Sequence, residues 1–168
     1  MHFLRGLRTK MPEKVHFVIT LFGLISIIVL LFSVAALVIH FRILQLRGNA
    51  DDSFIQVETL IRKQVDLFYD IGAAHKTGSS LCDLCEEADE LHAKEVFASL
   101  PSIEKELENL KIEADEQAPL KENMHELMRS AEEYNKHTEK YNTFIRSLPG
   151  SAMAAIVGLK YEKALQVH

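Results

Sequence analysis

The chain has 168 residues, a formal net charge of −5, and only seven glycines and four prolines. A mildly acidic balance argues against binding to nucleic acid, and the abundance of Ala, Leu, Glu, Lys and Ile favours helices. The charged residues are unevenly distributed, because one long N-terminal stretch contains none.

That stretch is VHFVITLFGLISIIVLLFSVAALVI, residues 15–39, and it contains no Asp, Glu, Lys or Arg. A helix rises about 1.5 Å per residue, so this one is long enough to cross a hydrocarbon core of about 30 Å with some tilt. It is too long for the apolar region of a cleaved signal peptide, and no A-x-A site follows it. We therefore expect a transmembrane helix over residues 15–40, with the lipid bilayer as its partner.

A basic tail, residues 1–14, precedes the expected membrane helix. Its positive charges are those of Arg5, Arg8, Lys10 and Lys14. Fewer basic residues follow the span closely, namely Arg42 and Arg47. Because positively charged flanks tend to stay in the cytoplasm, a single-pass protein is expected, with a cytoplasmic N-terminus and an extracytoplasmic or lumenal helical region. The tail residues are also expected to face anionic lipid headgroups.

Residues 41–149 are expected to form an antiparallel up-and-down four-helix bundle, which makes the fold class all-α. The expected limits of its helices are about residues 49–75, 80–99, 102–114 and 119–148. The first helix continues from the membrane helix, and Pro101 is expected to end the second.

The last of these helices has an apolar seam whose steps alternate between three and four residues. The seam consists of Leu120, Met124, Leu127, Ala131, Tyr134, Thr138, Tyr141, Ile145 and Leu148. Tyr134 and Tyr141 lie one heptad apart, and an asparagine, Asn135 or Asn142, follows each. A buried tyrosine needs a partner for its hydroxyl, and a flanking amide can supply bonds across to a neighbouring helix. The four residues are expected to form a polar packing seam, with an interaction site as the alternative.

The C-terminal segment, residues 150–168, contains the uncharged run AMAAIVGL. This run is too short to span a membrane. Because the last helix of an up-and-down bundle returns toward the bilayer, Pro149, Ala152 and Gly158 are expected to be membrane-proximal. The alternative is a helix that caps the bundle without touching lipid.

Two blocks of the sequence resemble the LemA family of bacterial membrane proteins. They are FIQVETLIRKQVDLF and EEYNKHTEKYNTFIRSLPGSAMAAIVGLK, and the second contains both Tyr-Asn pairs, Pro149, Ala152 and Gly158. The resemblance implies a membrane-anchored helical bundle and offers no known catalytic residues to carry over. No cofactor is expected. We expect a non-enzymatic interaction or scaffolding module in a bacterial membrane. Its expected partners are membrane or envelope proteins, or a second copy of the chain.

The resemblance leaves open the side of the membrane on which the bundle lies and the branch of the family to which the chain is similar. The usual arrangement of the family places the bundle in the cytoplasm, whereas the basic tail predicts the reverse. One branch of the family, from magnetotactic bacteria, takes part in building magnetosome membranes. The basic tail and the divergent segment Phe68, Tyr69, Asp70 and Ile71 would suit that branch, so a role in vesicle formation is the alternative function.

Two further patterns suggest chemistry. In CDLC, Cys82 and Cys85 lie one helical turn apart, and packing is expected, with a local disulfide or metal or redox chemistry as alternatives. The pairs Asp89-x-x-His92 and Glu122-x-x-His125 have the spacing found in di-metal bundles. Glu122 and His125 are expected to lie off the inward seam, so no metal site is expected, and a metal-binding bundle is the second alternative function.

Overall fold

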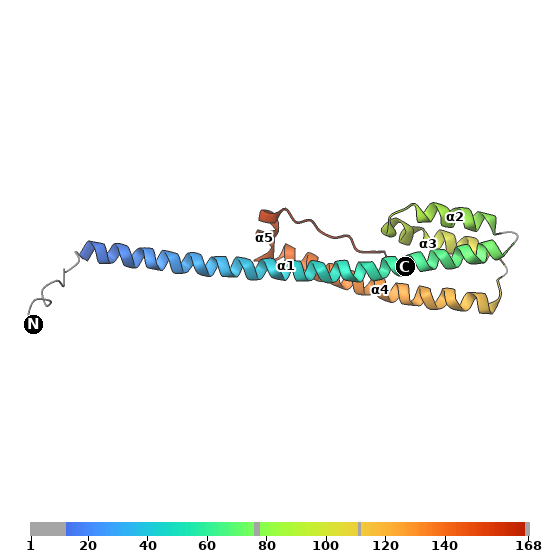
Figure 1. The fold of residues 1–168 in the computed structure, drawn as a ribbon, viewed down its shortest axis with the longest axis horizontal. Helices are drawn as coiled ribbons and strands as arrows, with labels where there is room; N and C mark the ends of the chain where they lie inside the picture. Colours follow the sequence, from blue (N-terminus) through green and yellow to red (C-terminus); the bar gives the residue numbers. More distant parts are fainter. Residues whose placement is uncertain (1–12, 76–77, 111, 167–168) are drawn as a thin grey trace, which may run out of the picture. The chain divides into compact units, whose positions relative to one another are not determined.

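The computed structural model describes residues 13–75, 78–110 and 112–166. Five helices and no β-strand occur in these residues: α1 Glu13–Ala74, α2 Ser79–Asp89, α3 Ala93–Glu108, α4 Ala114–Arg146 and α5 Gly150–Val157 (Figure 1). The all-α class is therefore confirmed. Arg5, Arg8 and Lys10 lie outside the described residues, as does the side chain of Lys14.

The N-terminal part of α1 is apolar and fully exposed. It contains a window with a mean hydropathy of 2.9, and none of that window is buried in the protein. Exposed large side chains here include Phe17, Phe22, Leu24, Ile27, Leu30, Leu31, Phe32, Leu37 and Val38. By its length and composition this helix could cross a membrane, as the sequence predicted.

The chain forms two compact units, Met1–Phe41 and Arg42–His168. We call the described part of the second unit, residues 42–166, the helical body. Four helices and the C-terminal end supply its core, which includes Val57, Ile61, Phe68, Leu81, Cys85, Val96, Phe97, Leu100, Leu107, Leu120, Leu127, Ala131, Tyr134 and Leu165. Spacings of three and four residues place these side chains on one face of each helix, and their burial stabilises the body.

The predicted boundary between the second and third helices is wrong. α2 ends at Asp89, and α3 runs through Pro101 instead of starting after it. The backbone N–H of His92 donates to the Glu95 carboxylate at 3.3 Å, which ties down the start of α3. Pro101 costs α3 one internal hydrogen bond, but its ring is exposed and leaves the buried Leu100 in place.

The predicted seam of α4 is buried along most of its length, but Met124 and Leu148 depart from the prediction. Met124 is only half-buried, and the buried polar residue next to it is Asn123. The Nδ2 group of Asn123 donates to Gln64 Oε1 at 2.8 Å and to the carbonyl oxygen of Leu60 at 3.0 Å. Leu148 is 81% exposed because α4 already ends at Arg146.

Candidate functional site

Both Tyr-Asn pairs bind the C-terminal tail, which we define as residues 160–166. The tail has no regular secondary structure and runs beside α4 in the opposite direction (Figure 1). We call Tyr134, Asn135, Tyr141 and Asn142 the tail-binding site. The sequence placed these residues on one side of a helix. The neighbouring helix expected as partner of the asparagines is wrong, because both asparagines bind the tail.

Each asparagine binds one tail residue through both of its backbone polar groups. Asn142 Nδ2 donates to the carbonyl oxygen of Glu162 at 2.8 Å, and Asn142 Oδ1 accepts from the Glu162 N–H at 3.0 Å. Asn135 makes the same two bonds to Leu165, at 2.8 Å and 2.7 Å. A side-chain amide presents a donor and an acceptor side by side, so it pairs with a peptide backbone as a neighbouring β-strand would.

Each tyrosine hydroxyl donates to a tail carbonyl oxygen. Tyr141 binds the carbonyl of Lys160 at 3.2 Å, and Tyr134 binds that of Lys163 at 3.0 Å. The two rings are 1% and 3% exposed, respectively. Burial of the rings fixes the positions of the hydroxyls, and the tail satisfies their hydrogen-bonding capacity at the edge of the core.

The heptad spacing of the pairs matches a spacing of three residues in the tail. Seven helical residues advance about 10.5 Å, and three extended residues advance about 9–10 Å. The tyrosines therefore bind residues 160 and 163, and the asparagines bind residues 162 and 165. A repeat of three is that of polyproline II, whereas a β-strand presents equivalent groups every second residue. This match explains why Tyr-Asn recurs after seven positions.

Lys94, in the first turn of α3, joins the tail-binding site to the rest of the helical body. Its Nζ donates to the Tyr134 hydroxyl at 2.9 Å and to the carbonyl oxygen of Lys163 at 3.4 Å. It also lies 5.1 Å from the ring centroid of Phe54 and 3.9 Å from a carboxylate oxygen of Glu162. One cation thus contacts the tail backbone, a carboxylate and aromatic ring faces.

Leu165 is the one buried side chain of the tail. It is 7% exposed and belongs to the core cluster, whereas Lys160, Tyr161, Lys163 and Ala164 are exposed. The tail is therefore held by its backbone and a single apolar anchor.

The net free energy of docking the tail is small. Its six hydrogen bonds to the tail-binding site contribute about 1 kcal/mol each, and the burial of Leu165 adds about 2 kcal/mol. Ordering the backbone costs roughly 1–2 kcal/mol per residue, which is similar in total. The docked tail is thus favoured by a small margin, and it is expected to open transiently while the helical body stays folded.

The chain turns from α5 into the tail at Gly158. Gly158 has φ 72°, in the left-handed region that favours glycine, and the Leu159 N–H donates to the carbonyl oxygen of Ala154 at 3.0 Å. The Arg146 guanidinium then lies 4.7 Å from the ring centroid of Tyr161. Pro149 and Ala152, predicted with Gly158 to be membrane-proximal, have exposed side chains.

Burial is the largest influence on the Tyr141 hydroxyl, and it raises the pKa above the ordinary value. The Arg47 guanidinium acts in the opposite direction, while the carboxylates of Glu162 and Asp51 act in the same direction as burial. The hydroxyl therefore keeps its proton at neutral pH and remains a donor to the tail.

The two cysteines are free thiols. Burial raises the pKa of Cys85 to about 12, and the nearby Cys82 and Asp66 act in the same direction. A protonated thiol is a poor nucleophile and metal ligand, so this environment favours packing over redox or metal chemistry.

In the described part of the chain, no three His, Cys, Asp or Glu side chains are grouped so as to hold a metal ion. The two Asp/Glu-x-x-His pairs, whose spacing resembles that of di-metal bundles, make other contacts or face solvent. Asp89 lies 3.5 Å from Arg62, and His92 precedes the first turn of α3. Glu122 and His125 are exposed on α4.

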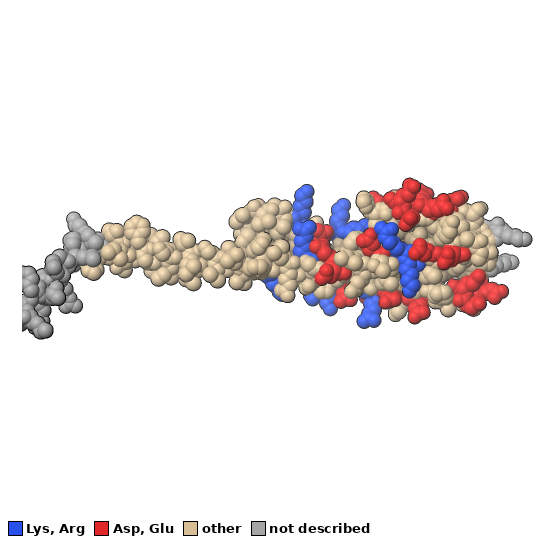
Figure 2. Space-filling model, viewed as in Figure 1, with Lys and Arg blue, Asp and Glu red and all other residues tan. Residues whose placement is uncertain are grey.

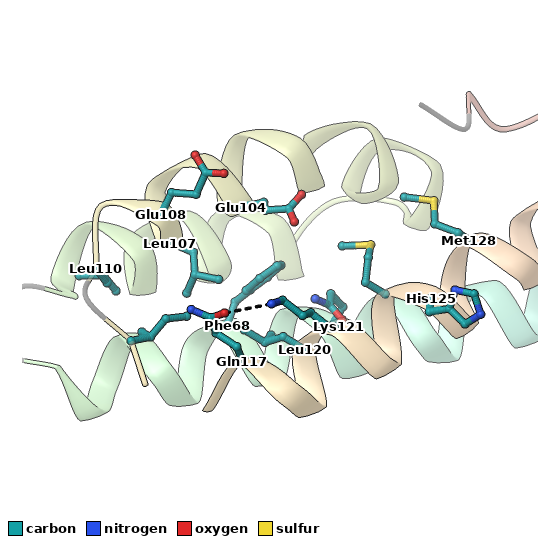
Figure 3. Close-up of a pocket in the computed structure, with 13 residues that line it drawn as sticks. Phe68, Glu104, Leu107, Glu108, Leu110, Gln117, Leu120, Lys121, His125 and Met128 are labelled. Carbon is teal, nitrogen blue, oxygen red and sulfur yellow. Dashed lines mark hydrogen bonds between the residues drawn. The ribbon is translucent and has the colours of Figure 1, made fainter. Parts of the chain in front are cut away.

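A groove of about 600 Å³ lies between α1, α3 and α4. Its apolar lining includes Phe68, Leu107, Leu110, Leu120, Met124 and Met128 (Figure 3). Glu104 and Glu108 project from α3 beside it, and Lys121 on α4 donates to Gln117 at 3.1 Å. The charged side chains of its lining are exposed.

No family model, curated protein or solved structure matches the chain. Among the residues at the site, sequence reasoning missed Lys94, Glu162 and Leu165. No sequence pattern marks Lys94, because the groups that it contacts come from distant segments of the chain. No pattern marks the tail either, because most of its bonds are made by backbone groups that every sequence possesses.

Proposed function

We propose that the chain is a single-pass membrane protein whose helical body is a non-enzymatic interaction or scaffolding module at the bilayer surface. The supporting observation is the exposed apolar part of α1, which continues without a helix break into the helical body. Leaving so many large apolar side chains in water is unfavourable, and a bilayer removes them from it.

We place one end of the helical body at the membrane surface. Arg42 follows the expected span closely and lines a shallow groove together with Ser147, which follows α4. The uncharged α5 comes next in the chain, and its Ile156 is 80% exposed. A short apolar helix of this kind is suited to the headgroup boundary rather than to spanning.

The opposite end of the helical body carries negative charge. On the face shown in Figure 2, acidic side chains gather over α2 and the adjoining end of the body. The exposed acidic residues of α2 include Asp83, Glu86, Glu87 and Asp89. Anionic lipids would repel this surface, which supports an orientation with α5 toward the bilayer and α2 away from it.

The finer assignments are also proposals. We propose that α1 to α4 form an up-and-down four-helix bundle of the LemA type, and the core that these four helices share supports the bundle. The basic tail, residues 1–14, supports a cytoplasmic N-terminus. A place in the magnetosome branch stays a prediction.

Extraction of the full chain from cell membranes tests membrane anchoring. We expect it to resist alkaline carbonate and high salt and to be released by detergent. The matched control is a chain lacking residues 15–40, which we expect in the soluble fraction. Release of the full chain by carbonate alone would contradict the proposal.

A single engineered cysteine tests the orientation. Glu126 is exposed on α4, so Glu126→Cys should react with a membrane-impermeant maleimide from the side on which the helical body lies. Labelling in intact cells, above the background of the native chain, would support an extracytoplasmic body. Labelling in broken cells alone would contradict that orientation while leaving membrane anchoring intact.

A further inference from the structure

The tail-binding site recognises main-chain atoms. All six of the hydrogen bonds that it makes to the tail go to backbone N–H or carbonyl groups. Such groups occur in nearly every peptide, and domains that bind extended peptides gain affinity from main-chain bonds and specificity from pockets for individual side chains. The tail is held in a similar way, through its backbone and the buried side chain of Leu165.

Two side chains of the tail give the site a sequence preference. Leu165 enters the core, and Glu162 lies 3.9 Å from the Lys94 ammonium group. The exposed Tyr161, Lys163 and Ala164 leave room for other residues at their positions. A matching peptide would therefore carry an acidic residue followed, three positions later, by an apolar one.

We propose that the tail-binding site binds an extended peptide segment of a partner protein, of the form acidic-x-x-apolar, and that the C-terminal tail is its resident competitor. The proposal rests on the proposed function of the helical body as an interaction module, and it names the surface and the chemistry of the partner. A covalently attached tail has a high effective concentration, so a partner segment binds well only when it outcompetes the tail or when the tail is displaced.

The test uses the full chain in detergent micelles, with a site-specific protease sequence inserted between Gly158 and Leu159. Binding of a fluorescent peptide, GLKYEKALQ (residues 158–166), is followed by anisotropy before cutting, and after cutting and removal of the released tail. We expect saturable binding to the cut chain and at least about tenfold weaker binding to the uncut chain.

Backbone recognition has its own control in the peptide. N-methyl groups on the amides of Glu162 and Leu165 remove the two N–H groups that donate to the asparagine Oδ1 atoms. Peptide binding should therefore weaken at least about tenfold. N-methylation at Lys163 and Ala164, whose amides have no hydrogen-bond partner in the described part of the chain, should have a much smaller effect.

The protein side has matched variants on the same helix. Asn135→Ala combined with Asn142→Ala should abolish peptide binding, whereas Lys136→Ala combined with Thr143→Ala changes exposed neighbours and should preserve it. If circular dichroism shows that cutting unfolds the body, Leu165→Ala in the uncut chain replaces the cut. This variant loosens the tail and must raise peptide binding.

Three results would overturn the proposal: no saturable binding to a folded cut chain, equal binding of the doubly N-methylated peptide at residues 162 and 165, or equal binding by the double asparagine variant. Each of these leaves carbonate-resistant membrane association unaffected. Loss of that association with peptide binding intact would instead contradict the membrane role.

Discussion

The two Tyr-Asn pairs make the same bonds to the tail in different surroundings. At the Tyr134–Asn135 pair, Lys94 donates to the hydroxyl of Tyr134, and Leu165 is buried in the core. At the Tyr141–Asn142 pair, the bonds go only to the tail backbone, and the nearby Tyr161 is 57% exposed.

The difference follows the covalent connection of the tail. Next to the Tyr141–Asn142 pair the tail is still close to α5, so backbone bonds form at a small entropic cost. The Tyr134–Asn135 pair holds the end farther from α5, where the chain has more freedom. A buried side chain and a lysine supply the additional attachment there. Backbone bonds thus set the register of the tail, and Leu165 anchors its far end.

The largest expected effect comes from removing the rings, which are equally buried in both pairs. Tyr141→Ala and Tyr134→Ala should each lower the free energy of unfolding by about 3 kcal/mol or more, because each leaves a cavity in the core. Chemical denaturation of the detergent-solubilised chain measures this. Tyr→Phe at either position keeps the ring and should cost far less. An unchanged denaturation curve for Tyr141→Ala would mean that the ring has no packing role.

Removing the buried Leu165 side chain is expected to abolish the additional attachment at the Tyr134–Asn135 pair. Leu165→Ala should weaken tail docking by about 2–3 kcal/mol through lost burial, while the melting temperature of the helical body changes little. Limited proteolysis after Lys163 reports release of the tail. Ala164→Gly is a control at an exposed neighbour. Equal cleavage of Leu165→Ala and the native chain would argue against an apolar anchor.

Removing one amide is expected to affect one end of the tail. Asn142→Ala and Asn135→Ala each lose two hydrogen bonds, worth about 1–2 kcal/mol together. Asn142→Ala should accelerate amide exchange at Glu162, and Asn135→Ala should accelerate it at Leu165. Thr143→Ala, beside Asn142, should do neither. If either variant accelerates exchange equally at both residues, the two pairs act as one unit.

The smallest effect is confined to alkaline pH. Because burial raises the pKa of Tyr141 above its ordinary value of 10.0, the folded protein holds this proton more tightly than the unfolded chain does. The contribution is therefore fully present below pH 10.0 and is lost as pH rises through the folded-state pKa. Thermal unfolding from pH 8 upward should show a decline that Tyr141→Phe reduces. An identical decline in both proteins would rule out Tyr141 as its source.

Regular spacing made much of the fold predictable. The apolar run of α1 and the alternating three- and four-residue steps of α4 both depend on helical periodicity, which correctly placed Tyr134, Thr138 and Tyr141 in the core. A different signal, Pro101, misplaced the start of α3. A proline is a strong local signal against a helix, but the buried neighbours Leu100 and Ile103 outweigh the one hydrogen bond that Pro101 forfeits.

The candidate site was predictable only in part. The repeat singled out Tyr134, Asn135, Tyr141 and Asn142, yet the expected partner was a neighbouring helix. The tail that they bind has no periodic pattern, and its recognition uses main-chain atoms that every sequence shares. The relation between a heptad and three extended residues emerges once both segments are seen together.

Amide hydrogen exchange along the tail, measured by NMR on the full chain in micelles, tests whether the Tyr-Asn pairs hold the tail in the folded protein. We expect slow exchange at Glu162 and Leu165, whose N–H groups donate to the asparagine Oδ1 atoms, and fast exchange at Tyr161, Lys163 and Ala164. Asn135→Ala with Asn142→Ala should make all five fast. Uniformly fast exchange in the native chain, or protection that survives in the double variant, would contradict the claim that the Tyr-Asn pairs hold the tail by its backbone.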